Sequence, residues 1–430
     1  MGLVQHFQKY FEANVKPIVT TRFLALDLYS FVYQKFTKMP IMWDRSGQEF
    51  IPCEDPRDTR GFQFEAIVGI SVVAICYVVV LVQQVSMSED SAGPHVSVLT
   101  LMTVYAAIHV CIFIISVAVE MFKHGPDYGR GYNGLKRLED EIILDHPQHD
   151  HRTPSQLYTF AFLTLYMSIY YATLPLVMLA AFLYMDIDPA MYILDMLFGP
   201  SPPRILKNFS LHPPFSSHLP RLLVRSCLMW IFGIGFSRLT CLVFITSTTN
   251  FTRTHHILEL ISRINAYQKL KAMMFYNELQ LICKDINLLQ DSVLMGLLSI
   301  GFMLNGCTIY LSIQGYRVLP FGVHAMFVGL AVMNISATMT IIPFLVDTNQ
   351  IGINLLANWR LQFSSKLQRK RANAMTPTKV NCSMGQYRIF SMTKTAKNKL
   401  YAALIEFPVN MLLGYSRDEF EMRFQVGKQN

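Results

Sequence analysis

Six long apolar stretches, separated by polar segments, dominate the chain. They cover residues 64–85, 96–122, 157–185, 222–246, 293–313 and 321–346. A bilayer core of about 30 Å is crossed by roughly 20 apolar residues in a helix, because a helix satisfies its own backbone hydrogen bonds. The pattern therefore predicts an all-α polytopic membrane bundle, with six transmembrane helices within residues 64–346.

Two weaker apolar segments flank these six. Residues 400–415 predict a seventh, shorter span, which Glu406 and Pro408 interrupt. Residues 23–43 are apolar but carry Asp27, Lys35 and Lys38. Such a mixture favours an amphipathic helix lying on the membrane, within an N-terminal region of residues 1–63.

The basic residues predict the orientation, because cytosolic loops of membrane proteins are enriched in Lys and Arg. The loops 123–156 and 247–292 each hold five basic residues, and 347–399 holds ten; by contrast 86–95 has none, 186–220 has two and 314–320 has one. The alternation predicts a cytosolic N-terminus and a cytosolic region 347–399. If residues 400–415 span the membrane, the tail 416–430 is external; if they do not, it is cytosolic.

The composition supports this reading. The chain of 430 residues is 52% hydrophobic and only 15% charged, and its mean hydropathy is +0.31. An ordinary soluble domain carries about 25% charged residues. The net charge of +8 fits basic flanks on the cytosolic side of a bilayer, and indicates no nucleic-acid partner.

The outer loops carry one modification signal. Asn-X-Ser/Thr triplets begin at four asparagines: Asn208, Asn250, Asn334 and Asn381. Only Asn208 falls in a loop predicted to be external, so a glycan is expected there alone. No cysteine lies in an outer loop, so no external disulfide is expected.

Several predicted helices continue beyond the bilayer. Apolar residues recur at three- and four-residue steps through 247–292 and again through 349–363, which is typical of helices with one packed face. The fourth, fifth and sixth spans are therefore expected to project into the cytosol as a helical anchor, with a turn at 375–385 before the last helix.

Polar side chains inside the spans are costly and point to function or to packing. The predicted buried polar network comprises Arg238, Asn305 and Asn334, with Glu120 and Asp347 as potential partners of the arginine. Two interpretations stay open: a network that locks helices together, or a direct part in ligand binding or gating.

Aromatic residues gather in the outer halves of the spans. A pocket of rings with a few polar tips suits a small, weakly polar ligand, although aromatics are also frequent at membrane interfaces. The candidate pocket residues are His109, Tyr170, Tyr171, Trp230, Tyr310, His324 and Phe327.

No motif for catalysis, a cofactor or a phosphate loop occurs, so no enzyme activity or cofactor is expected. The one cluster of metal-ligand residue types is 145–151, with three histidines and two aspartates. Pro147 interrupts it, and a solvated polar loop is the favoured interpretation over a zinc site.

The end of the chain resembles a known signature. Insect gustatory receptors carry Thr-Tyr, five hydrophobic residues and Gln-Phe in their last span. Residues 400–407 match with Leu400 for Thr, one hydrophobic residue fewer, and Glu406 for Gln. Residues 276–287, Trp359 and the basic stretch after it are also similar to the family. The chain thus resembles the arthropod gustatory and odorant receptors.

That resemblance implies a specific assembly. Those proteins have seven spans, an internal N-terminus and an external C-terminus, and form tetrameric ligand-gated cation channels in the plasma membrane. Their seventh spans surround the pore, their cytosolic helices join the subunits, and their ligand pocket opens outward among spans two to six. Here the implied pore residues are Tyr401, Leu404, Glu406 and Phe407.

The leading hypothesis is therefore a chemosensory, non-selective cation channel subunit, homo- or heterotetrameric, gated by a tastant or an odorant. The alternative is a six-span transporter or other membrane protein whose last helix is cytosolic.

Overall fold

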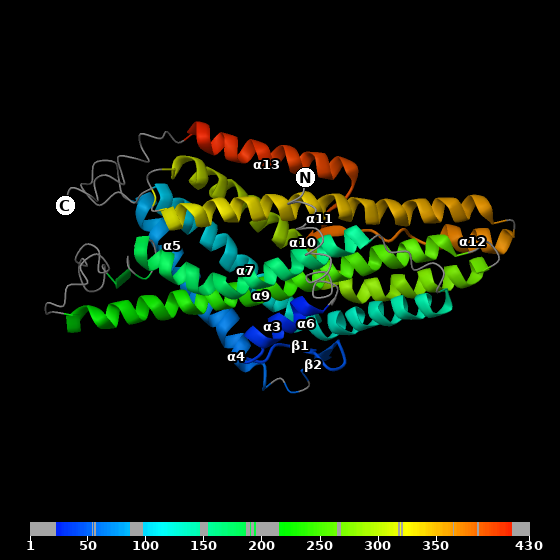
Figure 1. Ribbon diagram of the computed structural model, residues 1–430, viewed down its shortest axis with the longest axis horizontal. Coiled ribbons are helices and arrows are strands. Elements are labelled where there is room, and N and C mark those ends of the chain that lie inside the picture. The colour runs from blue at the N-terminus through cyan, green and yellow to red at the C-terminus, as the bar shows by residue number, and fades with distance from the viewer. Residues whose placement is uncertain are drawn as a thin grey trace, which may run out of the picture.

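The computed structural model describes residues 23–53, 55, 57–86, 98–146, 154–185, 190, 193–194, 215–264, 268–316, 319, 321–363, 365–384 and 387–414. Long helices lie side by side along the longest axis of the molecule (Figure 1). The major ones are α5 (Ile70–Ser86), α6 (Val98–Asp145), α7 (Pro154–Met185), α9 (Phe215–Arg263), α10 (Lys269–Gln314) and α11 (Phe321–Gln362). An all-α polytopic bundle is confirmed.

Six helices in the described part of the chain are long and apolar enough to cross a membrane. They are Arg60–Val82, Val104–Asp145, Thr159–Ala180, Pro220–Arg263, Lys269–Gln314 and Phe321–Gln362, and each contains or overlaps one predicted span. Large apolar side chains such as Ile75, Ile112 and Val332 point away from the bundle and are more than half exposed. A lipid-facing surface accounts for such exposure, because hydrocarbon replaces water around these residues.

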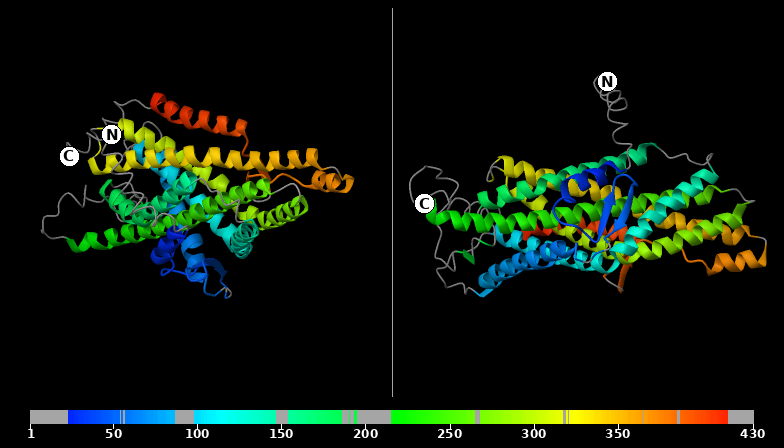
Figure 2. Two further views of the ribbon diagram at one scale, coloured as in Figure 1. Left: turned by 45° about the vertical axis from the view of Figure 1, so that its right-hand side comes forward. Right: turned by 90° about the horizontal axis from the view of Figure 1, so that it is seen from below.

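Four of these helices are much longer than a bilayer is thick, among them α9, α10 and α11. With 49, 46 and 42 residues, α9, α10 and α11 extend over 60 Å at about 1.5 Å per residue, twice the hydrocarbon core. The predicted continuation of the fourth, fifth and sixth spans as helix is confirmed. Their extensions pack beside one another at one end of the molecule (Figures 1 and 2).

The segment 123–156, predicted as a loop, is largely helical. α6 continues without a break to Asp145, through Pro126 and four glycines near it. The glycines are explained by close packing: a Cβ on Gly131 would lie 2.4 Å from Ile286 Cγ1 of α10, and Gly134 faces Ile282. Small residues in α6 therefore let the two helices approach closely.

The N-terminal segment 23–43 is not a single amphipathic helix on the membrane. α3 (Leu24–Tyr33) ends ten residues earlier, and a hairpin of β1 (Ile41–Asp44) and β2 (Glu49–Pro52) follows. The pairing is antiparallel, with Ile41 opposite Pro52. The buried face of α3 lies against α7 and α9, where the Tyr33 hydroxyl donates to the Tyr171 carbonyl oxygen at 2.5 Å. Protein, rather than lipid, covers this face.

The C-terminal part contains a second hairpin that the sequence pattern did not predict. After α12 (Lys366–Ala374), an extended segment leads into β3 (Asn381–Met384) and β4 (Tyr387–Ser391), where a turn was expected. The strands are antiparallel, with an irregularity between Cys382 and Ser383. Val380, Cys382 and Met392 are buried in a cluster with residues of α10 and α11. The hairpin therefore fixes the start of the last helix, α13 (Lys394–Gly414).

Candidate functional site

The last helix, α13, packs along one edge of the bundle against α10 and α11, opposite α3 and the first hairpin (Figure 1). Phe407 anchors it. A Cβ built on Gly306 of α10 would lie 2.1 Å from Phe407 Cδ1, so the ring rests directly on the glycine backbone. Phe302, one turn before Gly306 on α10, has its ring centroid 4.9 Å from that of Phe407. Such knob-on-glycine contacts are typical of membrane helices, where van der Waals packing holds neighbours together.

The opposite face of α13 has no cover in the described structure. Ile405 is 65% exposed, Val409 44% and Leu413 81%, and their spacing of four residues places them on one stripe. Glu406 and Asn410 are exposed beside them. Repeated around an axis, apolar side chains can close a pore by excluding water, and a ring of carboxylates favours cations.

Of the four implied pore residues, only Tyr401 continues the four-residue spacing of this stripe, and it is half-buried. Glu406 borders the stripe, whereas Phe407 turns to α10 and Tyr401 packs towards the cluster beneath the second hairpin. Leu404 is half-buried. That these residues line a pore stays a prediction; the uncovered face of α13 is marked by Ile405, Val409 and Leu413.

The ends of α10, α11 and α13 that lie away from the helical extensions meet in a small cluster. Tyr310 and Leu311 are buried there, with Phe327, Met411 and Leu412 packed against them. Nearby, His324 of α11 donates from Nε2 to the Ser312 carbonyl oxygen at 2.9 Å. Two candidate ligand residues, Tyr310 and Phe327, therefore lie in the same hydrophobic cluster as the end of α13.

The other candidate ligand residues lie elsewhere in the bundle. Tyr171 is buried in the main core, 6.1 Å from the Phe236 ring of α9 between centroids, with Tyr170 beside it. Trp230 is 36% exposed on α9. On α6, His109 bonds to the carbonyl oxygen of Tyr105 in its own helix, at 2.9 Å. These four do not join the hydrophobic cluster that holds Tyr310 and Phe327.

Arg238, halfway along α9, is 1% exposed. Its guanidinium donates to the hydroxyl and the carbonyl oxygen of Thr37. Its Nη1 lies 3.4 Å from Glu65 Oε2, and its Cζ lies 5.5 Å from the centre of the Phe62 ring. An isolated cation at such depth would cost several kcal/mol, and a carboxylate with neutral acceptors offsets that cost.

The partner predicted for this arginine was wrong. Glu120 lies instead 3.6 Å from His124, one turn along α6, and Asp347 is exposed. The partner Glu65 lies in a short π-helical segment, Phe64–Gly69, at the start of the first span. Arg238 thus joins the loop after α3, the entry of the first span and α9.

The other two members of the predicted network are not linked to Arg238 by hydrogen bonds among the described residues. Asn305 of α10 is buried, and its Oδ1 has no hydrogen-bond partner there. The same holds for Nδ2 of Asn334 on α11.

A second buried charged group ties α6 to α9 in the helical extension. Glu139, only 2% exposed, accepts a hydrogen bond from His256 Nδ1 at 2.8 Å. The other carboxylate oxygen lies 3.7 Å from Arg253 Nε. The sequence pattern did not reveal this group, because residue 139 was assigned to a loop.

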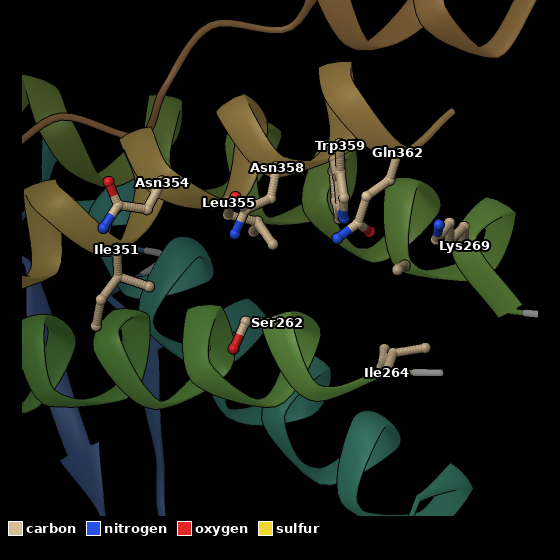
Figure 3. Close-up of a pocket in the computed structure, with 10 residues that line it drawn as sticks. Ser262, Ile264, Lys269, Ile351, Asn354, Leu355, Asn358, Trp359 and Gln362 are labelled. Atoms are coloured by element: carbon tan, nitrogen blue, oxygen red, sulfur yellow. The ribbon is translucent and has the colours of Figure 1, made fainter. Parts of the chain in front are cut away.

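The tips of α9, α10 and α11 enclose a cavity of about 290 Å³. Asn354, Asn358 and Gln362 line it from α11 at four-residue steps, and Ser262 of α9 and Lys269 of α10 also line it (Figure 3). This concentration of amides makes it a polar cavity, unlike the aromatic pocket expected from the sequence.

Two predictions concern residues mostly outside the described part of the chain. Asn208, the expected glycan site, is one of them. Of the cluster 145–151 only Asp145 and His146 are described, and the Asp145 carboxylate pairs with Lys271 Nζ at 2.7 Å. No group of three metal-ligand side chains occurs among the described residues.

Comparison with known proteins gives a clear structural likeness. No protein-family model matches the chain, and no curated protein matches it. Solved structures do match. One is the insect olfactory receptor OR5 from Machilis hrabei, with a TM-score of 0.53 at 10% identity, covering 91% of this chain and 98% of that one. Its complex with eugenol gives the same TM-score at 9% identity, covering 91% and 97%.

The chain has the fold of an insect olfactory receptor. The match spans both the membrane-length helices and their extensions, since it covers 91% of the chain. With six membrane-length helices in this olfactory-receptor fold, the protein is a multi-pass membrane protein.

Proposed function

We propose that this protein is a subunit of a chemosensory, ligand-gated, non-selective cation channel. Four subunits, identical or mixed, surround a pore lined by α13, and a small odorant or tastant opens it. The proposal places the protein in the plasma membrane, with its N-terminus and helical extensions in the cytosol.

The observation that carries the proposal is the two-sided character of α13. One face is fixed to α10 through Phe407 and Gly306. The other presents Ile405, Val409 and Leu413 without cover, beside the exposed carboxylate of Glu406. An apolar ring can close a pore and a carboxylate ring favours cations, and a fourfold arrangement of α13 supplies both.

Ligand control follows from the small cluster at the ends of α10, α11 and α13. Tyr310 and Phe327 share a hydrophobic cluster with Met411 and Leu412 of α13, so a ligand that moves these rings also moves the helix. The related solved structure was determined with eugenol, a small aromatic molecule. We propose a ligand of similar class, bound among the outer halves of the spans.

Whole-cell recording from cells that express the protein at their surface tests the proposal. A panel of volatile and tastant molecules should evoke cation currents. The double substitution Tyr310→Ala/Phe327→Ala should shift the effective ligand concentration and leave the reversal potential unchanged. Phe162→Ala, which removes an exposed ring on α7, is the matched control. No evoked current from the surface-expressed protein across the panel contradicts the proposal.

A six-span protein with a cytosolic last helix is the second candidate. It is favoured by α13 itself, which is not among the six membrane-length apolar helices of the described chain and carries Lys394, Lys397 and Lys399 in its first two turns. An epitope fused after residue 430 decides the matter: antibody access on intact cells supports the seventh span, and access only after permeabilisation supports the second candidate.

A further inference from the structure

The chain is strongly basic after its sixth span. Between residues 348 and 405 it has ten Lys or Arg residues and no Asp or Glu. A stretch of one charge sign creates a field that attracts counter-ions and anionic partners. The structure shows where part of this charge is concentrated.

A groove of about 1070 Å³ runs between α10 and a wall formed by residues 376–383 and Arg388. Three cations line it: Lys284 from α10, and Lys379 and Arg388 from the opposite wall. Asn277 and Asn287 add side-chain amides along the α10 wall. Such a lining offers many hydrogen-bond donors to an anion.

The wall opposite α10 is held rigidly. The hydroxyl of Tyr276 donates to the Thr376 carbonyl oxygen at 3.0 Å and accepts from the Thr378 backbone N–H at 3.0 Å. The Gln280 amide donates to the same carbonyl oxygen. The groove is therefore formed before any ligand arrives, which reduces the entropic cost of binding.

Two of the three cations in the groove are not paired with a carboxylate among the described residues. Among the described residues, neither Lys284 nor Lys379 takes part in an ion pair. One carboxylate, Asp291, lies at the end nearest the membrane, where the backbone and side chain of Asn381 donate hydrogen bonds to it and Arg388 offsets its charge. Burial raises the pKa of the neighbouring Cys382 thiol to about 12, so this sulfur adds no negative charge at neutral pH.

The position of the groove suits a ligand at the membrane surface. Its upper end, at Asp291, lies two residues before the expected start of the fifth span at 293. Its lower end, at Asn277, is 14 residues away along α10, about 21 Å at the helical rise. A polyphosphorylated headgroup reaches the upper end from the inner leaflet, and a soluble polyphosphate reaches the same cations from the cytosol.

We propose that this groove is a regulatory site for a polyphosphorylated anion, held by Lys284, Lys379 and Arg388. Phosphate oxygens accept charge-assisted hydrogen bonds from the three cations, and the amides of α10 position the ligand. The bound anion ties α10 to the hairpin that precedes α13. The proposal goes beyond channel function. It depends on the proposed function in one respect only: the orientation of the protein, which places the groove on the cytosolic side of the membrane.

Binding to the purified full-length protein in detergent micelles tests the proposal, with inositol hexakisphosphate as the soluble probe. Phosphatidylcholine vesicles with and without phosphatidylinositol 4,5-bisphosphate form the second arm. Lys284→Ala/Lys379→Ala should weaken binding about tenfold or more, since each removed contact is charge-assisted. Lys366→Ala/Lys370→Ala on α12, which removes the same charge outside the groove, should stay within about threefold of the wild type because salt screens distant charges.

The two arms identify the source of the ligand. Binding in both arms supports a lipid headgroup, and binding of the soluble probe alone supports a cytosolic anion. Absence of saturable binding in both arms overturns the proposal, as does an equal loss in the groove and α12 variants. The test also distinguishes an anion from a second copy of this chain in the groove. If a second copy occupied the groove, Lys284→Ala/Lys379→Ala would change the particle mass in light scattering and no anion would bind, and this result overturns the proposal. None of these readouts requires channel current, so the proposed function can fail separately.

Discussion

The contact between Gly306 and Phe407 offers a sharp test of how α13 is held. Replacing Gly306 with Ala places a methyl group 2.1 Å from Phe407 Cδ1 and 2.2 Å from Cε1 if nothing moves. Carbon atoms in favourable contact lie about 3.5–4.0 Å apart. The ring must therefore shift by well over 1 Å, and α13 moves with it or the ring rotates.

The expected cost follows from two opposing effects. Overpacking a well-packed site costs about 1–3 kcal/mol, whereas alanine is better than glycine inside a helix by about 1 kcal/mol. Gly301, on the same helix, has no heavy atom within 4 Å of a built Cβ. Gly301→Ala therefore reports the helix effect alone, and Gly306→Ala should be about 1–3 kcal/mol less stable than this control.

The free energy of unfolding, measured by SDS titration in mixed micelles, gives this difference. Removing the ring with Phe407→Ala should then abolish it, because the added methyl group finds space. The double-mutant cycle should yield a coupling of about 1–3 kcal/mol, the size found for residues in contact. Equal stabilities of the Gly301→Ala and Gly306→Ala variants, unchanged in the Phe407→Ala background, would refute the packing of α13 described here.

Three further predictions address the buried charge, the pore and the topology. Arg238→Ala should lower the stability by about 3–5 kcal/mol in thermal melting, because Glu65 is left without its cation. Adding Glu65→Gln to this variant should restore part of the loss. The exposed control Arg130→Ala should lose less than about 1 kcal/mol. Glu406→Gln should reduce the permeability of divalent relative to monovalent cations, and Glu406→Lys should suppress cation current; unchanged reversal potentials in both would place this side chain outside the pore. Asn208→Gln should abolish the endoglycosidase-sensitive shift in gel mobility, and a shift that persists would contradict the external position of the loop 186–220.

Hydrophobic periodicity was sufficient to predict the long helices. The six spans need only an apolar run of bilayer length, and the extensions of α9, α10 and α11 show apolar residues at helical spacing. Both signals are local, so neither depends on which helix packs against which. The structure confirms the six long helices and the three extensions because local signals of this kind are independent of tertiary packing.

Contacts between distant residues could not be predicted in this way. Arg238 and Glu65 are separated by 173 residues, and nothing in the pattern around either one selects the other. The continuation of α6 was missed because glycine normally lowers helix stability, and only the nearness of Ile286 explains why Gly131 is suitable there. The free face of α13 is an intermediate case: its spacing was visible, but which face is free depends on where Phe407 packs.

The contacts that Arg238 makes at the middle of α9 have a mechanical consequence. Arg238 lies 23 residues from the start and 25 from the end of this helix, which leaves two arms of about 35 Å. Because α9 is held at its middle by Thr37 and Glu65, a rigid tilt of this helix pivots about Arg238. A small sideways push on the outer arm then swings the far tip by a similar amount in the opposite direction, without any break in the helix.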